Sequence, residues 1–295
     1  MSDARALVVG ATGQLGSVIV RQLVASGARV RALARNADKL ASAAAGAELA
    51  PTDLRDIRKL TEACAGVDTI IATANNNLSS GASSPTRIDL AMYQNLCAAA
   101  RNAGVRRLIY VSYRGAANDS PVDIFRVKWY IEDAIKRSGV PFVMLRPSAF
   151  MDVWIDQLLA PGIRDKGVAT IFGDGERLCN YIAVDDVAAF AVKIFEAQVA
   201  NETIDVGGPS DVSQNDLATL IERHLNKRAR RRHVPVAAMR LLPPLIRPFN
   251  EVTARLMTLG FYSATMATPF PNWQAAANRF SISPRSVERH IDQLK

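Results

Sequence analysis

The chain has 295 residues, of which 49% are hydrophobic and 22% are charged, and its formal net charge is +8. This composition is that of a globular protein with a sizeable core, and it excludes a disordered or fibrous chain. The three cysteines, Cys64, Cys97 and Cys179, lack the paired spacing of a disulfide framework or a zinc site. We therefore expect a cytoplasmic protein that binds no metal. The sequence starts without a secretory signal and has no apolar run of the ~18 residues that span a bilayer, so we expect no membrane partner.

Short aliphatic runs alternate with amphipathic segments in the first half of the chain, which predicts an α/β fold with a doubly wound parallel sheet. The expected strands are 6–10, 29–34, 47–50, 68–73, 106–112 and 141–147. The expected helices Gln14–Ala25, Thr86–Asn102 and Asp123–Arg137 each have a glycine just beyond their end. After Pro147, glycine and proline become more frequent. We predict a nucleotide-binding domain over 1–147 and a smaller, mainly substrate-side region over 148–295, with segments that return to the first sheet.

Three glycines, Gly10, Gly13 and Gly16, lie between the first expected strand and the first expected helix. In this setting the first glycine permits a tight turn, the second lets the backbone approach a pyrophosphate, and the third lets the helix pack against the strand. The helix N-terminus presents free amides and the positive end of its dipole. The pattern predicts a Rossmann-type turn that binds a dinucleotide.

The residue after the second strand predicts which dinucleotide binds. An acid about 20 residues beyond the glycine turn would hold the 2′-hydroxyl of NAD, whereas an arginine accommodates the 2′-phosphate of NADP. The sequence has Arg35 at this place, followed by Asn36 and Lys39. A guanidinium can hold a phosphate with two N–H groups, and Lys39 can add a second charge. We therefore predict NADP(H) as the cofactor, although an arginine at a strand end can also be merely solvated.

Several longer stretches resemble a known family. The spacing in GATGQLG resembles the extended and atypical branches of the short-chain dehydrogenase/reductase superfamily, and FRVKWYIEDAIKRSGVPFVMLRPSAF, residues 125–150, is most similar to the NmrA-like group. That group includes NADPH-dependent isoflavone and phenylcoumaran benzylic ether reductases, quinone reductases, and redox-sensing regulators that bind the nucleotide without turning it over. The resemblance covers residues 5–210 and implies an NAD(P)-binding protein.

The glycine turn, the charge pattern and the resemblance together give a set of candidate cofactor contacts. They are Gly10, Thr12, Gly13, Gln14, Leu15, Gly16, Arg35, Asn36, Lys39, Asp53, Leu54, Thr73, Ala74, Asn75, Ser112, Lys128, Pro147, Ser148 and Phe150. For the polar stretch Asn75–Ser80 the alternative is an ordinary surface loop. The apolar residues of 151–159, Trp154 among them, recur at helical spacing, which favours a place in the core over one in a pocket.

The resemblance also bears on catalysis. The family's usual proton donor is a tyrosine four residues before its lysine; Lys128 matches the lysine, but position 124 is Ile. Tyr130 would point to a different face of the helix, whereas Tyr113 ends a strand at the edge where such sheets bind ligands. We therefore name Lys128 and Tyr113 as candidate catalytic residues. A lysine on a solvated helix face is the alternative reading of Lys128.

These observations favour a reductase that passes a hydride from NADPH to a small apolar carbonyl, quinone or aromatic substrate. Two alternatives stay open, a nucleotide sensor that gates a protein partner and an assembly factor that has kept only the fold. The basic segment Arg223–His233 is typical of a solvated helix end that runs into an exposed strand. No aromatic residue interleaves its charges as base stacking favours, so we expect no nucleic-acid partner. The oligomeric state, a homodimer included, stays open.

Overall fold

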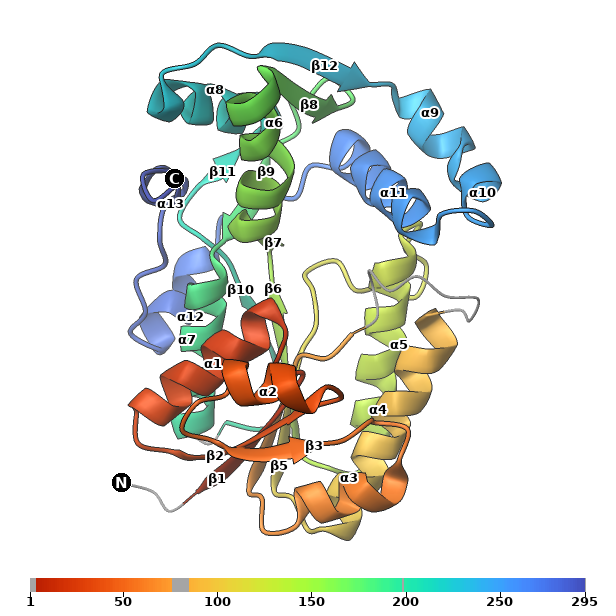
Figure 1. Cartoon of the computed structure of the whole chain (residues 1–295), viewed down its shortest axis with the longest axis vertical. Coiled ribbons are helices and arrows are strands. Elements are labelled where there is room, and N and C mark those ends of the chain that lie inside the picture. Colours follow the sequence, from red (N-terminus) through yellow and green to blue (C-terminus); the bar gives the residue numbers. More distant parts are fainter. Residues whose placement is uncertain (1–3, 76–84, 198, 295) are drawn as a thin grey trace.

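The structure, a computed structural model that describes residues 4–75, 85–197 and 199–294, is organised around a seven-stranded sheet (Figure 1). The strand order is β10-β6-β5-β4-β1-β2-β3, and every neighbouring pair is parallel. The strands are β1 (Arg5–Val9), β2 (Arg29–Ala34), β3 (Glu48–Pro51), β4 (Thr69–Ala72), β5 (Arg107–Val111), β6 (Phe142–Pro147) and β10 (Glu202–Val206). The central strands β1, β4 and β5 are almost wholly buried because helices cover both faces.

Two layers of helices enclose this sheet. Their bounds are α1 (Gln14–Ala25), α2 (Ala37–Ala43), α3 (Ile57–Cys64), α4 (Pro85–Asn102), α5 (Asp123–Arg137), α7 (Val184–Ala197) and α12 (Trp273–Arg279). One core cluster joins α1, α7 and α12 to the sheet through Ile19, Phe190 and Ala277, and a second joins α3, α4 and α5 through Leu60, Tyr93 and Ile131. The Rossmann-type α/β fold predicted from the sequence is confirmed.

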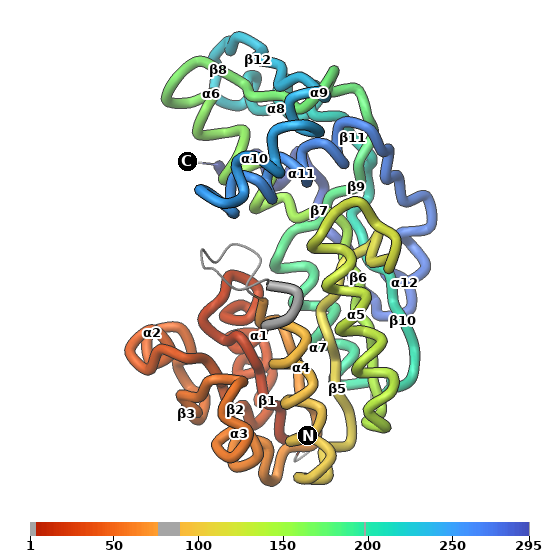
Figure 2. Tube along the Cα trace, turned by 90° about the vertical axis from the view of Figure 1, so that its right-hand side faces the viewer, coloured from red at the N-terminus to blue at the C-terminus, as the bar shows by residue number. Residues whose placement is uncertain are grey.

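The chain after β6 builds a second group of elements beyond the carboxyl ends of the strands (Figures 1 and 2). They are β7 (Ala149–Phe150), the π-helix η1 (Asp152–Leu159), α6 (Ala160–Lys166), β8 (Val168–Phe172), β9 (Cys179–Ile182), β11 (Asp211–Val212), α8 (Gln214–Leu225), β12 (Arg230–Val234), α9 (Val236–Leu241), α10 (Pro243–Ile246), α11 (Glu251–Thr265) and α13 (Val287–Ile291). A third core cluster, which includes Trp154, Ile163 and Leu217, holds this group together.

Residues 184–206 leave the second group and pack on the first sheet. Strand β10 pairs with β6, and α7 lies beside α1. The guanidinium of buried Arg107 donates to the carbonyl oxygens of Ile194 and Phe195, the last turn of α7, and so ties that helix to β5. Cations satisfy the free carbonyls at a helix C-terminus in this way. The chain therefore returns from the second group to complete the first sheet and one of its helix layers.

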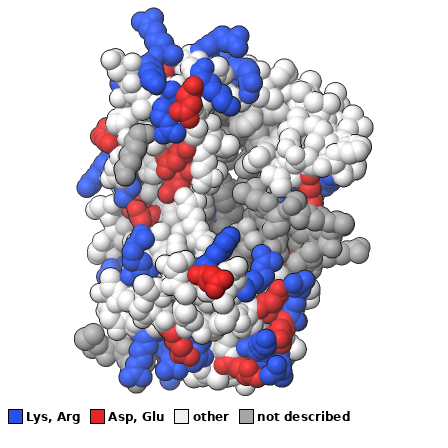
Figure 3. Space-filling model, in the orientation of Figure 1, with Lys and Arg blue, Asp and Glu red and all other residues white. Residues whose placement is uncertain are grey.

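The basic segment 223–233 includes the end of α8 and most of strand β12. Lys and Arg side chains gather on the surface there (Figure 3). Arg231 forms an ion pair with Glu222 at 2.7 Å, and Arg232 donates to Thr170. Part of the segment's charge is therefore compensated within the fold. In the described parts of the chain, no helix is both long and apolar enough to cross a membrane.

Candidate active site

A cavity of about 520 Å³ lies at the carboxyl ends of β1, β2, β4 and β5, where doubly wound sheets bind their ligands. Its walls include the glycine turn, the ends of these strands, and residues from α5, η1 and α11. Most of the predicted site residues line it, namely Gly10, Thr12, Gly13, Gln14, Leu15, Gly16, Arg35, Asp53, Leu54, Thr73, Ala74, Asn75, Ser112, Tyr113, Lys128 and Phe150. Residues from widely separated parts of the chain thus share one cavity.

The glycines of the turn differ in what surrounds them. Gly10 has φ +87°, and a Cβ there would lie 2.8 Å from the backbone nitrogen of Ala74. A Cβ on Gly16 would lie 2.1 Å from the carbonyl oxygen of Gly10, so the close packing of α1 on β1 requires a glycine. Among the described residues, a Cβ on Gly13 would meet only that same oxygen, at 3.3 Å. Gly13 is the N-cap of α1 and offers no side-chain hydrogen bond, which leaves the first amides of the helix available to a ligand.

The end of the cavity next to β2 and β3 is lined by polar and charged residues. Arg35, exposed, follows β2, and Asp53 and Leu54 follow β3. Asp53 is held by Arg55, whose Nε and terminal nitrogen donate to the carboxylate at 2.9 and 2.7 Å. The hydrogen bonds from Arg55 hold the pKa of Asp53 below its ordinary value, so this carboxylate is charged at neutral pH.

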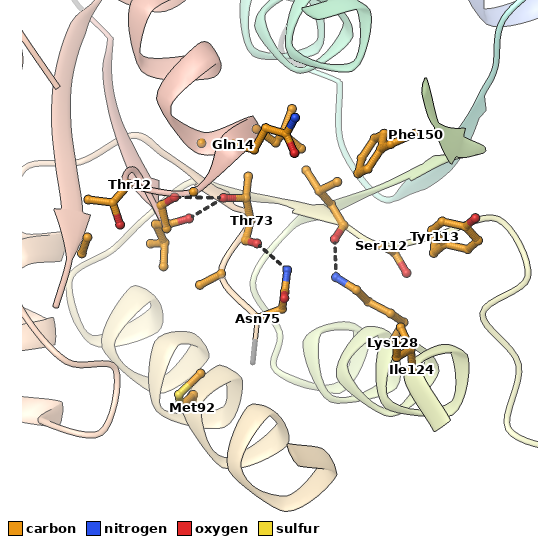
Figure 4. A pocket seen from close by; sticks show the side chains of 18 of the residues that line it. Thr12, Gln14, Thr73, Asn75, Met92, Ser112, Tyr113, Ile124, Lys128 and Phe150 are labelled. Carbon is orange, nitrogen blue, oxygen red and sulfur yellow. Dashed lines mark hydrogen bonds between the residues drawn. The ribbon is translucent and has the colours of Figure 1, made fainter. Parts of the chain in front are cut away.

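Lys128 extends from α5 toward the end of β5 (Figure 4). Its Nζ donates to the carbonyl oxygen of Val111 at 2.8 Å and lies 4.8 Å from the centre of the Tyr110 ring. Lys128 is only 7% exposed, and this burial lowers its pKa to about 8, although the carboxylates of Asp89 and Glu132 favour its charged form. The amine is therefore protonated at pH 7, but gives up its proton more readily than a solvated lysine does.

Ser112 and Tyr113 follow β5 and border the cavity beside Lys128 (Figure 4). The Ser112 hydroxyl is buried and has no hydrogen-bond partner among the residues that the structure describes. The Tyr113 ring stacks on Phe125 with 4.8 Å between ring centres, and burial raises the pKa of Tyr113 well above its ordinary value. Tyr113 therefore stays a neutral phenol, a hydrogen-bond donor that does not ionise at physiological pH.

Ile124 lies one helical turn before Lys128 and also lines the cavity (Figure 4). It occupies the place where the resemblance would put a tyrosine, so α5 contributes an apolar group there instead of a proton donor. Tyr130 stacks edge-on against Trp129 and is 40% exposed. Tyr130 does not line the cavity, in agreement with its position on another face of α5.

Four predicted cofactor contacts are not among the cavity-lining residues. Asn36 caps α2, since its Oδ1 accepts from the backbone N–H of Lys39. Pro147 ends β6, where its carbonyl oxygen accepts from the Arg114 backbone N–H, and the Ser148 hydroxyl donates to Asn180 at 2.7 Å. Asn36 and Lys39 are exposed near Arg35, whereas Pro147 and Ser148 are buried. Residues 76–80 of the predicted polar loop lie outside the described residues.

Many residues that line the cavity were not predicted from the sequence, among them those of η1 and α11. Trp154 belongs to the third core cluster as predicted, but it also lines the cavity together with Val153 from η1. The remaining unpredicted lining residues are Val9, Leu33, Ala34, Thr52, Met92, Val111, Phe125, Val184, Arg255, Leu256 and Leu259. Arg255 is only 4% exposed and forms an ion pair with Glu251 one turn earlier in α11. No motif marks these α11 residues, because their place at the cavity arises only from tertiary packing.

Comparison with known proteins identifies a family and several relatives of this chain. The family model described as the NmrA-like family matches residues 2–277. A protein of Arabidopsis thaliana named "Probable pinoresinol-lariciresinol reductase 3" is 31% identical over 238 residues, which are 76% of this chain and 74% of that protein. The (4-alkanoyl-5-oxo-2,5-dihydrofuran-3-yl)methyl phosphate reductase of Streptomyces griseus subsp. griseus is 29% identical over 287 residues, 91% of this chain and 96% of that one.

A similar fold is found in a solved structure of an NADPH-dependent quinone oxidoreductase from Escherichia coli, complexed with NADPH. Its TM-score is 0.80 at 21% sequence identity, and the match covers 97% of this chain and 98% of that chain. The structural likeness extends beyond the sheet into the elements that follow β6. Since the family match also spans both groups of elements, the chain described here belongs to the NmrA-like family.

Proposed function

We propose that this protein is an NADPH-dependent reductase of small apolar carbonyl, quinone or aromatic acceptors. The observation that carries the proposal is the single cavity that joins a phosphate-binding glycine turn to a buried lysine and an apolar wall. The relatives named above are reductases by name, and one similar structure is described as complexed with NADPH. Both facts support the same reaction class.

The residues present fit the cofactor. The amides at the start of α1 and the open position at Gly13 suit a pyrophosphate, and Arg35 suits the 2′-phosphate of NADPH. At the other end, the buried hydroxyl of Ser112, which has no partner among the described residues, and the amine of Lys128 suit the polar groups of a nicotinamide ribose. When bound, NADPH supplies the hydride, and the protein supplies position, polarity and protection from water.

The substrate half of the cavity is mostly apolar, which favours an acceptor with little charge. Phe125, Phe150, Trp154, Leu256 and Leu259 form this part of the lining. Flat aromatic or quinone-like molecules bury their faces well against such side chains. Because η1 and α11 supply three of these residues, we assign the elements after β6 to substrate binding.

Lys128 is the proposed proton donor. Its pKa of about 8 is close to the operating pH of a cytoplasmic enzyme, which is favourable for general acid catalysis. Its positive charge stabilises an acceptor oxygen that becomes negative as hydride arrives. Tyr113 is the second candidate donor, because its neutral phenol borders the same cavity. Ile124 cannot take part in proton transfer.

The test is NADPH oxidation with a panel of quinones and aromatic carbonyls, measured for the natural sequence, Lys128→Ala and Tyr113→Phe. We expect Lys128→Ala to lower kcat about 100-fold or more, since one charge-stabilising group typically has this effect. The dissociation constant for NADPH, measured by its fluorescence, changes less than about 5-fold because the lysine acts mainly in the transition state.

Lys136→Ala is the matched control, because Lys136 lies on the same helix but is 44% exposed and contacts only Glu132 at 3.9 Å among the ion pairs described. We expect it to keep the natural kcat. A Lys128→Ala protein with full activity would remove Lys128 from the mechanism. Tight NADPH binding without oxidation by any acceptor would instead support a nucleotide sensor.

A further inference from the structure

The positive charge of the chain is concentrated in residues 223–250. This stretch has eight Lys and Arg residues and no Asp or Glu, whereas the other 28 Lys and Arg residues equal the 28 Asp and Glu residues in number. The whole formal net charge of +8 therefore arises from this one stretch. A local excess of one sign favours binding to a surface of opposite charge.

Most of these charges are not compensated within the fold. Arg231 pairs with Glu222, and Arg247 pairs with Asp123 at 2.6 Å. The remaining six are exposed and form no ion pair within the described part of the chain, namely Arg223, Lys227, Arg228, Arg230, Arg232 and Arg240. An anionic partner can therefore reach them from solvent.

Exposed apolar side chains lie on the same stretch, in α9, in α10 and in the residues that follow them (Figure 1). Leu241 is 66% exposed and Phe249 is 91% exposed. Met239 and Pro243 are instead buried, since α9 and α10 pack on α11. The exposed set, called the apolar patch below, is Leu241, Leu242, Leu245 and Phe249. Several large apolar side chains exposed within one short segment are typical of an interaction site.

The combination of charge and protruding apolar side chains distinguishes between classes of partner. A nucleic acid would contact the arginines through its phosphates but would leave the leucines in water. A bilayer with anionic lipids matches both, because its phosphates attract Lys and Arg while Leu and Phe side chains enter the boundary between headgroups and acyl chains. Figure 3 shows the Lys and Arg side chains gathered over α8 and β12, beside the mostly uncharged surface of α9 and α10.

We propose that residues 223–250 form a docking surface for an anionic lipid bilayer, with the apolar patch inserted and the exposed Lys and Arg residues paired with lipid phosphates. A contact of this kind lies in the plane of the membrane surface and needs no spanning helix. The sequence-based expectation of no membrane partner rested on the lack of a spanning run, and the proposal departs from it.

The position of this surface suits an apolar acceptor. Helices α9 and α10 pack on α11, which supplies Leu256 and Leu259 to the cavity. A quinone or another apolar acceptor concentrates in a bilayer rather than in water, so docking brings the cavity close to its substrate. This last step rests on the proposed function, whereas the docking itself rests only on the charges and the apolar patch.

The test is co-sedimentation of the full chain with vesicles of phosphatidylcholine, either alone or with about 30% phosphatidylglycerol. We expect the anionic vesicles to bind about 10-fold more tightly at about 0.1 M salt, and about 0.5 M salt to remove most of this difference, because salt screens charges at the membrane surface. Arg228→Gln combined with Arg230→Gln should weaken binding to the anionic vesicles about 10-fold. Leu241→Ser combined with Phe249→Ser should weaken it by a similar factor, about 10-fold, since two inserted side chains are lost.

Leu49→Ser combined with Leu178→Ser is the matched control, because these leucines are 44% and 45% exposed and lie outside the docking surface. This variant should bind the anionic vesicles as the natural protein does. Equal binding to neutral and anionic vesicles would overturn the proposal, and so would a natural protein that binds neither and instead dimerises through the patch. Undiminished binding by the Leu241→Ser and Phe249→Ser protein would also overturn it, since charge alone would then make the contact.

Failure of this inference is distinguishable from failure of the proposed function. Vesicle binding without NADPH oxidation by any acceptor would contradict the reductase and support the docking surface. NADPH oxidation by a protein that binds no vesicles would contradict only the docking surface.

Discussion

At the scale of single residues, the glycines of the turn serve two separate purposes. Gly16 is required by packing, because a Cβ there would lie 2.1 Å from the Gly10 carbonyl oxygen and no side-chain rotation could relieve the contact. Gly13 has an extended backbone that alanine can adopt, and its Cβ position is close only to the same oxygen, at 3.3 Å, within the part of the chain that the structure describes. Its lack of a side chain therefore matters mainly to a ligand that approaches the start of α1.

This difference predicts opposite outcomes for two equal substitutions. Gly16→Ala forces α1 away from β1 and should lower the free energy of unfolding by about 2 kcal/mol, as overpacking commonly does. Gly13→Ala should cost less than about 1 kcal/mol of stability but weaken NADPH binding about 10-fold, since the methyl group stands where the pyrophosphate approaches. Denaturant unfolding and nucleotide titration measure both effects. Loss of stability in Gly13→Ala, with nucleotide affinity intact, would contradict the assignment.

At the scale of elements, α11 closes the cavity on the side away from the sheet. Leu256 and Leu259 line the cavity from this helix. The helix is packed tightly on β8, since a Cβ on Gly260 would lie 2.8 Å from the Phe172 ring. Arg255, buried within it, is held by Glu251. These contacts fix α11 as one wall of the cavity.

Smaller side chains on α11 should weaken binding of the acceptor without changing the affinity for NADPH. We expect Leu256→Ala and Leu259→Ala each to raise KM for an apolar acceptor about 5-fold to 10-fold, because each removes apolar contact area from the bound substrate. The dissociation constant for NADPH should stay within about 2-fold of its natural value. Leu245→Ala in α10 is the control, since Leu245 is 67% exposed and does not line the cavity. An equal rise in KM for the control would show that the effect does not arise from contacts within the cavity.

At the scale of the whole molecule, the sequence predicted best those features that depend on a few neighbouring residues. Short sequence patterns mark the glycine turn, the strand ends and the helix ends in the first half of the chain. Each strand and helix expected there begins and ends within one or two residues of its predicted bounds. Asn36 follows β2 and Ser148 follows β6, but the side chain of Asn36 caps α2 and that of Ser148 donates to Asn180. Such contacts depend on side-chain direction, which spacing alone does not determine.

The C-terminal part was harder to predict for a physical reason. Arg255 and Leu256 line the same cavity as the end of β5 through the packing of η1, β8 and α11, and short elements with glycine and proline carry weak periodic signals. Likewise, the buried state of Lys128 and its hydrogen bond to Val111 depend on how α5 docks beside the sheet. A sequence can place a lysine on a helix, but the pKa of that lysine is a property of the folded molecule.

We propose that Lys128 is the acid of an NADPH-dependent reduction. The most direct measurement is kcat/KM for the acceptor between about pH 6 and pH 10, for the natural protein and for Lys128→Ala. A general acid must carry its proton, so activity should be full at lower pH and decline as the pH rises through the Lys128 pKa of about 8. The Lys128→Ala protein should be slow throughout and should lack this decline. A natural protein whose rate is constant through about pH 9.5, or a Lys128→Ala protein with the same decline, would show that Lys128 is not the general acid.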